Sequence, residues 1–437
     1  MEVREPSAKY LARPAYKQTE VGVIPEDWEI PALSELITEM RGGAPLRPSD
    51  FTDSGVKVLP KGGVGRTGWL RVQDSEMQFC STRYARAHRR NQVDETFTIV
   101  VLRDLVPSGP SIGLMVKIRE PETYVLAQGV YGFKTNDRAV PSYLVQFSNT
   151  IWYRKLANSI MVGSTQVHIT NSAFKQVRVP LPTKAEQEAI AEALSDADAL
   201  IESLDQLIAK KRQIKQGAMQ ELLTGKRRLP GFSGEWELRL LSNVSWFQEG
   251  PGVRAWQFTT SGIKLLNGTN IVRGALNLDS TSRFISEAEA NSIYSHFLAD
   301  KGDIVVASSG ITVEKFHEKV AFVKAGDLPF CMNTSTIRFK PKQGILAPDF
   351  LFHLLKSDGF KQAIAGQATG SAQLNFGPSH IEKVLVVVPE YDEQTAIAAV
   401  LSDMDAELEA LESRLAKARQ IKQGMMQELL TGRIRLV

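Results

Sequence analysis

The 437-residue chain has few cysteines, no long apolar run and little excess of charge of either sign. Two cysteines, Cys80 and Cys331, cannot build a disulfide framework, which favours a reducing location inside the cell. The strongest apolar run, residues 384–388, has the length of a strand, whereas a membrane helix needs about 20 apolar residues. Residues 1–14 mix charged with small residues, which is not typical of a secretory signal. We therefore expect a cytoplasmic protein that does not contact a membrane.

Several kinds of catalytic motif are also missing. The chain has no Walker A sequence and no Asn-Pro-Pro-aromatic or Asp-Pro-Pro-aromatic tetrapeptide, the hallmark of amino-group methyltransferases. Residues 63–68 match Gly-x-Gly-x-x-Gly, but no long helix follows, so the context of a dinucleotide site is absent. The six histidines show no zinc spacing, and Asp50, Asp53 and Lys57 resemble a nuclease cluster only crudely. We predict no catalytic residue, no metal site and no bound cofactor.

The overall composition is that of an ordinary globular protein, with 43% hydrophobic and 23% charged residues. At roughly 150 residues per domain, the length predicts two or three domains. The net charge of +3 is small, but its distribution is uneven. Residues 1–182 carry 23 Lys and Arg against 18 Asp and Glu, whereas residues 230–390 carry 15 against 15. The first part of the chain therefore favours a polyanionic partner slightly.

An internal repeat organises the chain. Residues 212–225 read RQIKQGAMQELLTG and residues 419–432 read RQIKQGMMQELLTG, an offset of 207 positions. The same offset pairs Pro182 with Pro389, and an offset of 208 pairs Trp28 with Trp236. The chain is therefore two copies of one unit of about 207 residues.

The two copies are not equally similar throughout. Their last quarters are nearly identical, whereas the middle parts, residues 40–138 and 249–342, share almost nothing recognisable. Duplication followed by drift is one explanation, but drift should erode the whole unit. The pattern favours a retained frame with one shape, whose two inserts perform different tasks.

The retained quarter of each copy is predicted to be a long helix. Apolar residues recur at three- and four-residue steps from about Ala189 to Ile214 and from Ile397 to Met425, which indicates one apolar stripe on each helix. Gly225 and Gly432 are suited to end the helices, and Gly217 and Gly424 suggest a bend or a close helix–helix approach. Each helix would extend for roughly 50–60 Å.

A stripe of this length requires another long helix as its partner, and we expect the two copies to pair antiparallel. The alternative is that each helix packs only on its own domain. The divergent segments are predicted to be mixed α/β globules. Short β-rich runs lie at residues 56–59, 97–102, 304–307 and 336–339, and helical patterns lie at residues 142–158 and 349–364.

Four short stretches resemble a known family. Residues 17–28 contain KQTEVG and IPEDW, which look like the opening of specificity subunits of type I restriction–modification enzymes. Pro182 with Glu186-Gln187, and Pro389 with Glu393-Gln394, are similar to the start of that family's conserved helices. Residues 222–236, from LLTG to the tryptophan, resemble the family's central junction. These matches lie near both termini and in the middle of the chain.

The resemblance implies a non-catalytic subunit that reads DNA. Its two divergent segments would be target recognition domains, each reading one half of a bipartite, asymmetric site in double-stranded DNA. The subunit would hold two modification (methyltransferase) subunits and two restriction (motor-nuclease) subunits. S-adenosylmethionine and ATP would bind to those partners and not to this chain. The competing hypotheses are a stand-alone restriction enzyme or methyltransferase-like DNA-binding protein with unrecognised catalytic residues, and a purely structural tether.

We therefore predict an α+β fold in which two globular α/β target recognition domains are separated by two long antiparallel helices, a coiled-coil spacer, in a pseudo-twofold cyclic repeat. By the repeat, the C-terminus should lie near the segment before Trp28. The predicted boundaries are an N-terminal tail (1–17), a first recognition domain (18–182), a central helix (183–229), a second recognition domain (230–389) and a C-terminal helix (390–437).

The DNA-contact candidates are polar or basic residues of expected loops, because phosphates and base edges are contacted by Arg, Lys, Ser, Thr, Asn and Gln. In the first domain they are Arg41, Arg47, Lys61, Arg66, Arg83, Arg86, Arg89, Arg90, Ser108, Ser111 and Gln128. In the second they are Arg254, Lys264, Asn267, Asn270, Arg273, Ser308, Ser309, Lys315, Asn333 and Thr334.

Overall fold

The computed structural model describes residues 15–105, 108–365 and 373–436. Most of the tail predicted for residues 1–17 lies outside these ranges. The chain divides into two compact units. Unit 1 comprises residues 1–205 and 413–437, and unit 2 comprises residues 206–412. Each unit therefore combines one divergent segment with parts of both long helices.

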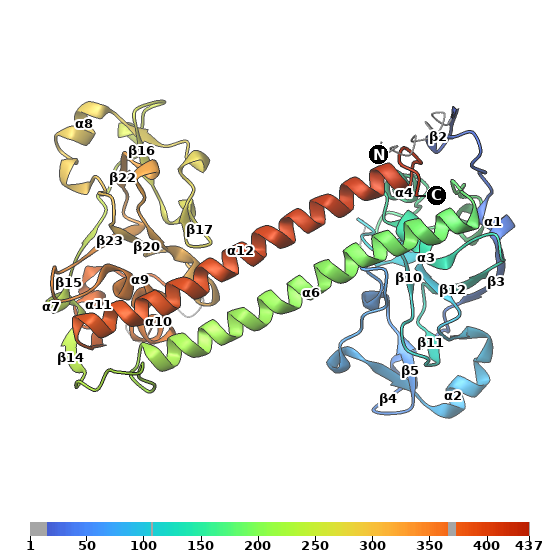
Figure 1. Cartoon of the computed structure of the whole chain (residues 1–437), viewed down its shortest axis with the longest axis horizontal. Helices are drawn as coiled ribbons and strands as arrows, with labels where there is room; N and C mark the ends of the chain where they lie inside the picture. Colours follow the sequence, from blue (N-terminus) through green and yellow to red (C-terminus); the bar gives the residue numbers. More distant parts are fainter. Residues whose placement is uncertain (1–14, 106–107, 366–372, 437) are drawn as a thin grey trace, which may run out of the picture. The chain divides into compact units, whose positions relative to one another are not determined.

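Unit 1 is built on a four-stranded antiparallel sheet in the order β10-β8-β12-β3 (Figure 1). Its central strand β8 has the sequence TIVV, and all four of its side chains are buried, as expected for β-branched residues inside a sheet. The strands are β3 (Ile37–Gly42), β8 (Thr98–Val101), β10 (Met115–Lys117) and β12 (Val130–Thr135).

A second sheet of unit 1 lies toward the end marked by α2 (Thr82–Ala87) in Figure 1. Its order is β4-β6-β5-β11-β7, and β5 and β11 pair in parallel. The strands are β4 (Phe51–Thr52), β5 (Val56–Leu59), β6 (Gln78–Cys80), β7 (Gln92–Val93) and β11 (Tyr124–Leu126).

Unit 2 repeats both sheets. Its larger sheet has the order β15-β23-β20-β21, and these strands correspond in turn to β3, β12, β8 and β10 of unit 1. Its smaller sheet, β19-β16-β22, contains the same parallel pair. The strands are β15 (Ser245–Glu249), β16 (Ile263–Leu266), β19 (Phe284–Ile285), β20 (Ile304–Ala307), β21 (Val320–Phe322), β22 (Phe330–Met332) and β23 (Thr336–Pro341).

This shared topology corrects the view that the middle parts have almost nothing in common. Equivalent strands align SGVK at residues 54–57 with SGIK at residues 261–264, again at an offset of 207. Gly55 and Gly262 both have positive φ, 140° and 125°. A Cβ on either glycine would lie 2.3 Å from a backbone oxygen, so neither site accepts a larger residue. The match was missed because it is short and has divergent sequence on both sides.

Paired helices pack beside each larger sheet, where the sequence predicts them. The helix expected at residues 142–158 is present as α3 (Pro141–Ser148) and α4 (Ile151–Ser159). The helix expected at residues 349–364 is present as α9 (Pro348–Lys356) and α10 (Asp358–Ala365). The tyrosines Tyr143 and Tyr153 are fully buried in the unit 1 core, and Phe350 occupies the unit 2 core.

Two two-stranded sheets in each unit complete the frame of the described residues. In unit 1, β1 (Tyr16–Thr19) pairs with β2 (Gly22–Pro25), and β9 (Arg103–Asp104) pairs with β13 (Val167–His168). In unit 2, β14 (Glu237–Leu240) pairs with β24 (Leu385–Val388), and β17 (Ile271–Val272) with β18 (Ala275–Leu276). The remaining helices are α1 (Leu33–Leu36), α5 (Asn171–Lys175), α7 (Leu241–Val244), α8 (Glu287–Asn291) and α11 (Pro378–Ile381).

The two long helices confirm the length expected from their apolar periodicity. Helix α6 (Lys184–Leu222) and helix α12 (Tyr391–Leu429) each have 39 residues, and both are followed by a glycine with φ near 70°. The interpretation of Gly217 and Gly424 as points of close helix approach is wrong, because a Cβ on either would meet nothing within 4 Å. No helix in the described ranges is long and apolar enough to cross a bilayer.

Within each unit, α6 and α12 are joined by matched ion pairs. In unit 1, Asp198 pairs with Lys422 and Asp205 pairs with Arg419. The later residue of α6, Asp205, thus pairs with the earlier residue of α12, Arg419, so the two helices are antiparallel, as predicted. The equivalent residues in unit 2 form the same bonds, between Asp405 and Lys215 and between Glu412 and Arg212. The side chains of Lys215 and Lys422 are only 10% and 11% exposed, so a shift of register would leave these ammonium groups without their carboxylates.

A buried glutamine ties the start of each long helix to its unit. Gln187 accepts a hydrogen bond from the amide of Val140 at 2.8 Å, and its Nε2 donates to the carbonyl of Pro182 at 3.0 Å. Gln394 makes the equivalent bonds in unit 2, with Ala347 and Pro389. The glutamine satisfies backbone groups that burial would otherwise leave unpaired.

The chain closes on itself in the way that the repeat predicts. In unit 2, Arg228 of the central junction binds the buried Glu393 through two bonds of 2.6 and 2.7 Å and lies over the ring of Trp236. In unit 1, Arg435 of the C-terminal segment binds the buried Glu186 and lies over the ring of Trp28. Arg435 also pairs with Asp27 at 2.9 Å.

The C-terminal segment therefore does for unit 1 what the central junction does for unit 2. The hydroxyl of Tyr16 donates to the carbonyl of Gly432 at 3.2 Å, which places the end of the chain beside its first described strand. Bonds to Glu186 and Asp27 raise the pKa of Arg435, and the bond from Arg435 lowers the pKa of Asp27. The predicted position of the C-terminus near the segment before Trp28 is confirmed.

Candidate nucleic-acid interface

The two units share a loop with an arginine at the same place. Residues 43–51 (GAPLRPSDF) and 250–258 (GPGVRAWQF) both leave the larger sheet and enter a one-turn helix. Arg47 and Arg254 precede that turn, and their amides donate to Asp50 and Gln257 at 2.8 and 3.0 Å. Both arginine side chains are exposed. A contact common to both units cannot distinguish two different half-sites, so these arginines suit the DNA backbone better than base edges.

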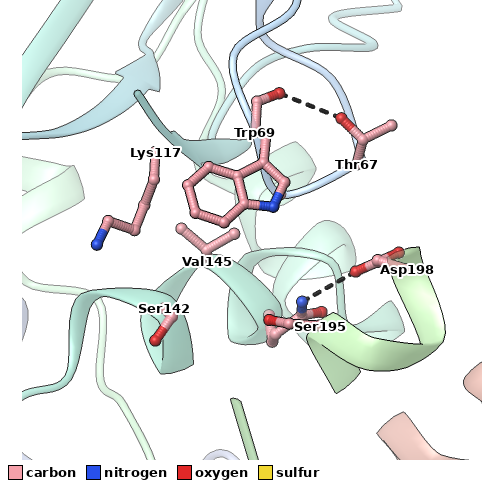
Figure 2. Close-up of a pocket in the computed structure, with 9 residues that line it drawn as sticks. Thr67, Trp69, Lys117, Ser142, Val145, Ser195 and Asp198 are labelled. Atoms are coloured by element: carbon pink, nitrogen blue, oxygen red, sulfur yellow. Dashed lines mark hydrogen bonds between the residues drawn. The ribbon is translucent and has the colours of Figure 1, made fainter. Parts of the chain in front are cut away.

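The loop after β5 is held against the frame of unit 1. Figure 2 shows Trp69 over Val145 of α3, with the hydroxyl of Thr67 bonded to the Trp69 carbonyl at 3.1 Å. Gln146, the next residue of α3, donates a hydrogen bond to Asp198 of α6 at 3.0 Å. The space between these groups is about 10 Å³, room for one water molecule and not for a ligand. The contact fixes the loop that carries Arg66.

Arg66 is exposed, and another guanidinium group is near it. Burial lowers the pKa of Arg154, and the positive charge of Arg66 lowers it further, so the two guanidinium groups are near one another. Arg154 itself is used internally, since it donates to the carbonyls of Ile112 and Pro110. Arg66 therefore remains available to an anionic partner.

A shallow groove runs beside the same loop in unit 1. It has a volume of about 620 Å³, and Trp69, Arg71, Arg119 and Glu202 contribute to its walls. Arg71 pairs with Glu202 at 2.6 Å, and the Arg119 guanidinium lies over the Trp69 ring. These cations are engaged in internal contacts, so the groove is not strongly positive.

Many candidate residues are exposed, as contact with DNA requires. In unit 1 the exposed candidates are Arg47, Arg66, Arg83, Arg86, Arg89, Arg90, Ser108 and Gln128. In unit 2 they are Arg254, Arg273, Ser309, Lys315 and Thr334. Arg273 has φ of 51°, a rare conformation for a residue other than glycine, in the tight turn between β17 and β18.

Other candidates are partly committed to internal contacts. Arg41 pairs with Glu39 and lies over the ring of Phe97. Lys264 pairs with Asp279 at 2.8 Å. The half-buried candidates are Arg41, Lys61, Ser111, Lys264 and Asn267, and Ser111 donates to Asp104 at 2.7 Å.

Three candidates are buried in unit 2, at Asn270, Ser308 and Asn333. Nδ2 of Asn333 donates to Oδ1 of Asn267 at 3.0 Å, and Oδ1 of Asn270 accepts from the amide of Asn267 at 2.9 Å. The hydroxyl of Ser308 donates to the carbonyl of Thr334. These side chains shape the loops after β16 and β22, and they are the weaker candidates for contact with bases.

Trp256 was missed by the sequence analysis. It lies in the one-turn helix after Arg254 and is 81% exposed, an unusual state for the largest apolar side chain. A tryptophan two positions from an arginine, in a loop rich in glycine and proline, was a signal that could have identified it. An exposed indole can stack on a base or on a sugar.

A duplicated α/β unit with a retained frame, exposed basic loops and antiparallel long helices defines a scaffold-and-recognition protein. Comparison with known proteins agrees. Residues 25–211 and 263–419 match the family described as the type I restriction modification DNA specificity domain. The chain therefore belongs to this family. Within it, the chain is a specificity subunit, which recognises the DNA target of a type I restriction–modification system and is not itself catalytic.

Individual relatives extend over nearly the whole chain. The type I restriction enzyme MjaVIII specificity subunit of Methanocaldococcus jannaschii is 24% identical over 427 residues, which is 94% of each chain. The solved S subunit of a type I system from M. genitalium superposes with a TM-score of 0.58 at 15% identity and covers 92% of this chain and 96% of its own. A chain solved in a study of type I complex assembly and conformational transition gives 0.54 at 13% identity, with 94% and 99% covered. These likenesses agree with the fold described above.

Proposed function

We propose that unit 1 and unit 2 each read one half of a bipartite, asymmetric site in double-stranded DNA, with α6 and α12 as the spacer. One observation supports this most strongly. The buried bonds of the frame recur at an offset of 207 residues, as in the pairs Arg228–Glu393 and Arg435–Glu186, while the exposed loops differ. A repeated frame with unlike loops suits one scaffold that presents two reading surfaces.

The exposed residues named above are the proposed DNA contacts. Arg47 and Arg254 would contact the backbone in both half-sites, because their loops are equivalent. Exposed residues that occupy equivalent positions but differ in type, such as Gln128 after β11 and Thr334 after β22, would contribute to the reading of bases. Arginine reads guanine through two hydrogen bonds, and each such contact contributes about 1–3 kcal/mol of discrimination.

The proposed protein partners are two modification (methyltransferase) subunits and, in the full complex, two restriction (motor-nuclease) subunits. Two nearly equivalent frames offer two equivalent docking surfaces, which suits two identical partners. The similarity to a chain from a study of type I complex assembly supports assembly with other subunits, without fixing their number. S-adenosylmethionine and ATP would be bound by those partners, and the complex would act in the cytoplasm.

Methylome sequencing of the host with and without the gene tests the proposed reading of DNA. We expect one split motif with a fixed gap to lose methylation when the gene is removed. A strain that carries Gln128→Ala should relax the sequence requirement in one half of the motif, and one that carries Thr334→Ala should relax it in the other half. A continuous motif, or no change on deletion, would contradict the proposal.

Co-purification tests the proposed stoichiometry. The chain is co-expressed with the methyltransferase subunit of its own system, and the mass of the purified complex is measured by light scattering. We expect one copy of this chain with two methyltransferase chains. A complex with a single methyltransferase would contradict the two equivalent docking surfaces.

A further inference from the structure

Helix α2 and the turn after it form a dense positive surface on unit 1. Residues 81–92 contain four arginines and no acidic residue, and Arg83, Arg86, Arg89 and Arg90 are all exposed. Throughout residues 15–105, 108–365 and 373–436, none of these four arginines forms an ion pair. We call these four residues the α2 arginine patch. Four like charges within eight residues repel one another unless an anion neutralises them.

Hydrogen bonding and ring stacking order the segment that carries the patch. The hydroxyl of Ser81 accepts a hydrogen bond from the amide of Tyr84 at 3.1 Å and so caps α2. The ring of Tyr84 is stacked on that of His88 at 4.0 Å. Arg83 and Arg86 are three residues apart on α2, so they lie on the same face. These two charges are therefore presented on one side of α2, and Arg89 and Arg90 follow in the next turn.

The equivalent element of unit 2 has the opposite charge. Helix α2 follows β6, which pairs antiparallel with β5, and helix α8 follows β19, which pairs in the same way with β16. The N-cap residue of α8, Ser286, accepts a hydrogen bond from the amide of Glu289 at 3.2 Å. Residues 286–297 nevertheless contain two glutamates and no lysine or arginine. One structural position thus carries four positive charges in unit 1 and two negative charges in unit 2.

We propose that the α2 arginine patch is a phosphate-backbone clamp that only the first recognition domain possesses. The clamp makes the contact of unit 1 with DNA the salt-sensitive part of binding, while unit 2 contacts DNA without it. Arginine suits this role because its planar guanidinium pairs with phosphate through two bonds. The inference rests on the proposed function, since it assigns a polyanion, DNA, to the surface of unit 1.

Salt dependence provides the test, because each phosphate contact releases counterions. The full chain in complex with its methyltransferase subunits is titrated with a random-sequence 40-bp duplex from 50 to 300 mM KCl. Each contact contributes about 0.9 to the slope of log affinity against log salt concentration. The variant R83Q/R86Q/R89Q/R90Q should therefore lower the slope by about 3 to 4.

Two variants that each remove two positive charges distinguish phosphate contacts of the patch from general electrostatic attraction. R83Q/R86Q removes two positive charges and should lower the slope by about 2. K155Q/K184Q removes two exposed lysines of α4 and α6 in unit 1 and should leave the slope unchanged. Equal effects of both variants would overturn the proposal in favour of general attraction.

A gain-of-charge variant keeps the test decisive if the quadruple variant does not fold. E287R/N291R adds two arginines on exposed positions of α8, and the slope should rise by about 2. An unchanged slope in all of these variants, with sequence-specific methylation retained, would refute the clamp and leave the proposed function intact. Loss of the methyltransferase subunits from the quadruple variant would instead identify the patch as a protein contact and would also refute it. A wild-type complex without sequence-specific methylation would refute the proposed function itself.

Discussion

His353 provides a pH test of how α9 packs against α12 in unit 2. The side chain is 1% exposed, its Nε2 lies 3.1 Å from the hydroxyl of Ser402, and its Nδ1 has no hydrogen-bond partner. Burial lowers the pKa of His353 to about 3, with a smaller opposing effect of Asp405. The equivalent residue of unit 1 is Gln146, which donates to Asp198 at 3.0 Å. The substitution His353→Gln thus introduces the residue that the first copy already carries.

The expected effect follows from the two pKa values. An unfolded histidine has a pKa near 6.5, whereas folded His353 stays neutral down to about pH 3. Its contribution is fully present above pH 6.5 and is lost as pH falls, because the unfolded state takes up a proton that the folded state does not. One proton changes the free energy of unfolding by about 1.4 kcal/mol per pH unit. Between pH 7 and pH 5 the wild type should lose about 2 kcal/mol that His353→Gln retains.

Hydrogen exchange of the α9 amides measures this loss in the full chain. After correction for intrinsic exchange rates, protection of residues 348–356 in the wild type should fall about 30-fold between pH 7 and pH 5 relative to His353→Gln. The reciprocal variant Gln146→His should introduce the same pH dependence into α3 of unit 1. If wild type and His353→Gln change in parallel, the reasoning on burial of His353 is wrong.

Three further predictions concern single side chains. Arg435→Ala leaves the buried Glu186 without its cation, so the free energy of unfolding of unit 1 should fall by about 3 kcal/mol. Hydrogen exchange of the β1 and β2 amides should become faster, while exchange in unit 2 stays unchanged. Equal loss of protection in both units would contradict this. Trp256→Ala should weaken binding of the cognate duplex about tenfold at an unchanged melting temperature, and unaltered affinity would remove the indole from the interface. Arg66→Ala should weaken binding of the cognate duplex by about 1–3 kcal/mol, and binding equal to wild type would show that Arg66 makes no base contact.

Local patterns in the sequence predicted the frame well. The apolar periodicity predicted two long helices, and each has 39 residues. The strand runs at residues 56–59 and 304–307 are β5 and β20 with the predicted bounds. These predictions succeeded because the period of apolar residues reports directly on helix or strand geometry. Residues 177–181, which the repeat aligns with the strand β24, form only isolated bridges such as Glu29 to Leu181.

The candidate DNA contacts were predicted less completely, since exposure depends on tertiary packing. Asn270 and Asn333 have the residue type of base-reading side chains, yet both are buried in a network that no local pattern reveals. Trp256 has the residue type of a core side chain, yet it is 81% exposed. Whether a polar or aromatic side chain faces solvent is decided by neighbours that are distant in the chain.

The sequence by itself determined the duplication, the long helices and the return of the C-terminus to the first segment, because a repeat obliges equivalent residues to make equivalent contacts. The tertiary structure alone showed that the two dissimilar middle parts share one topology. It also showed that α2 and α8 occupy the same position with opposite charge. Backbone hydrogen bonding and buried volume preserve a fold while exposed side chains change freely, so likeness of this kind is visible in coordinates after it has been lost from the sequence.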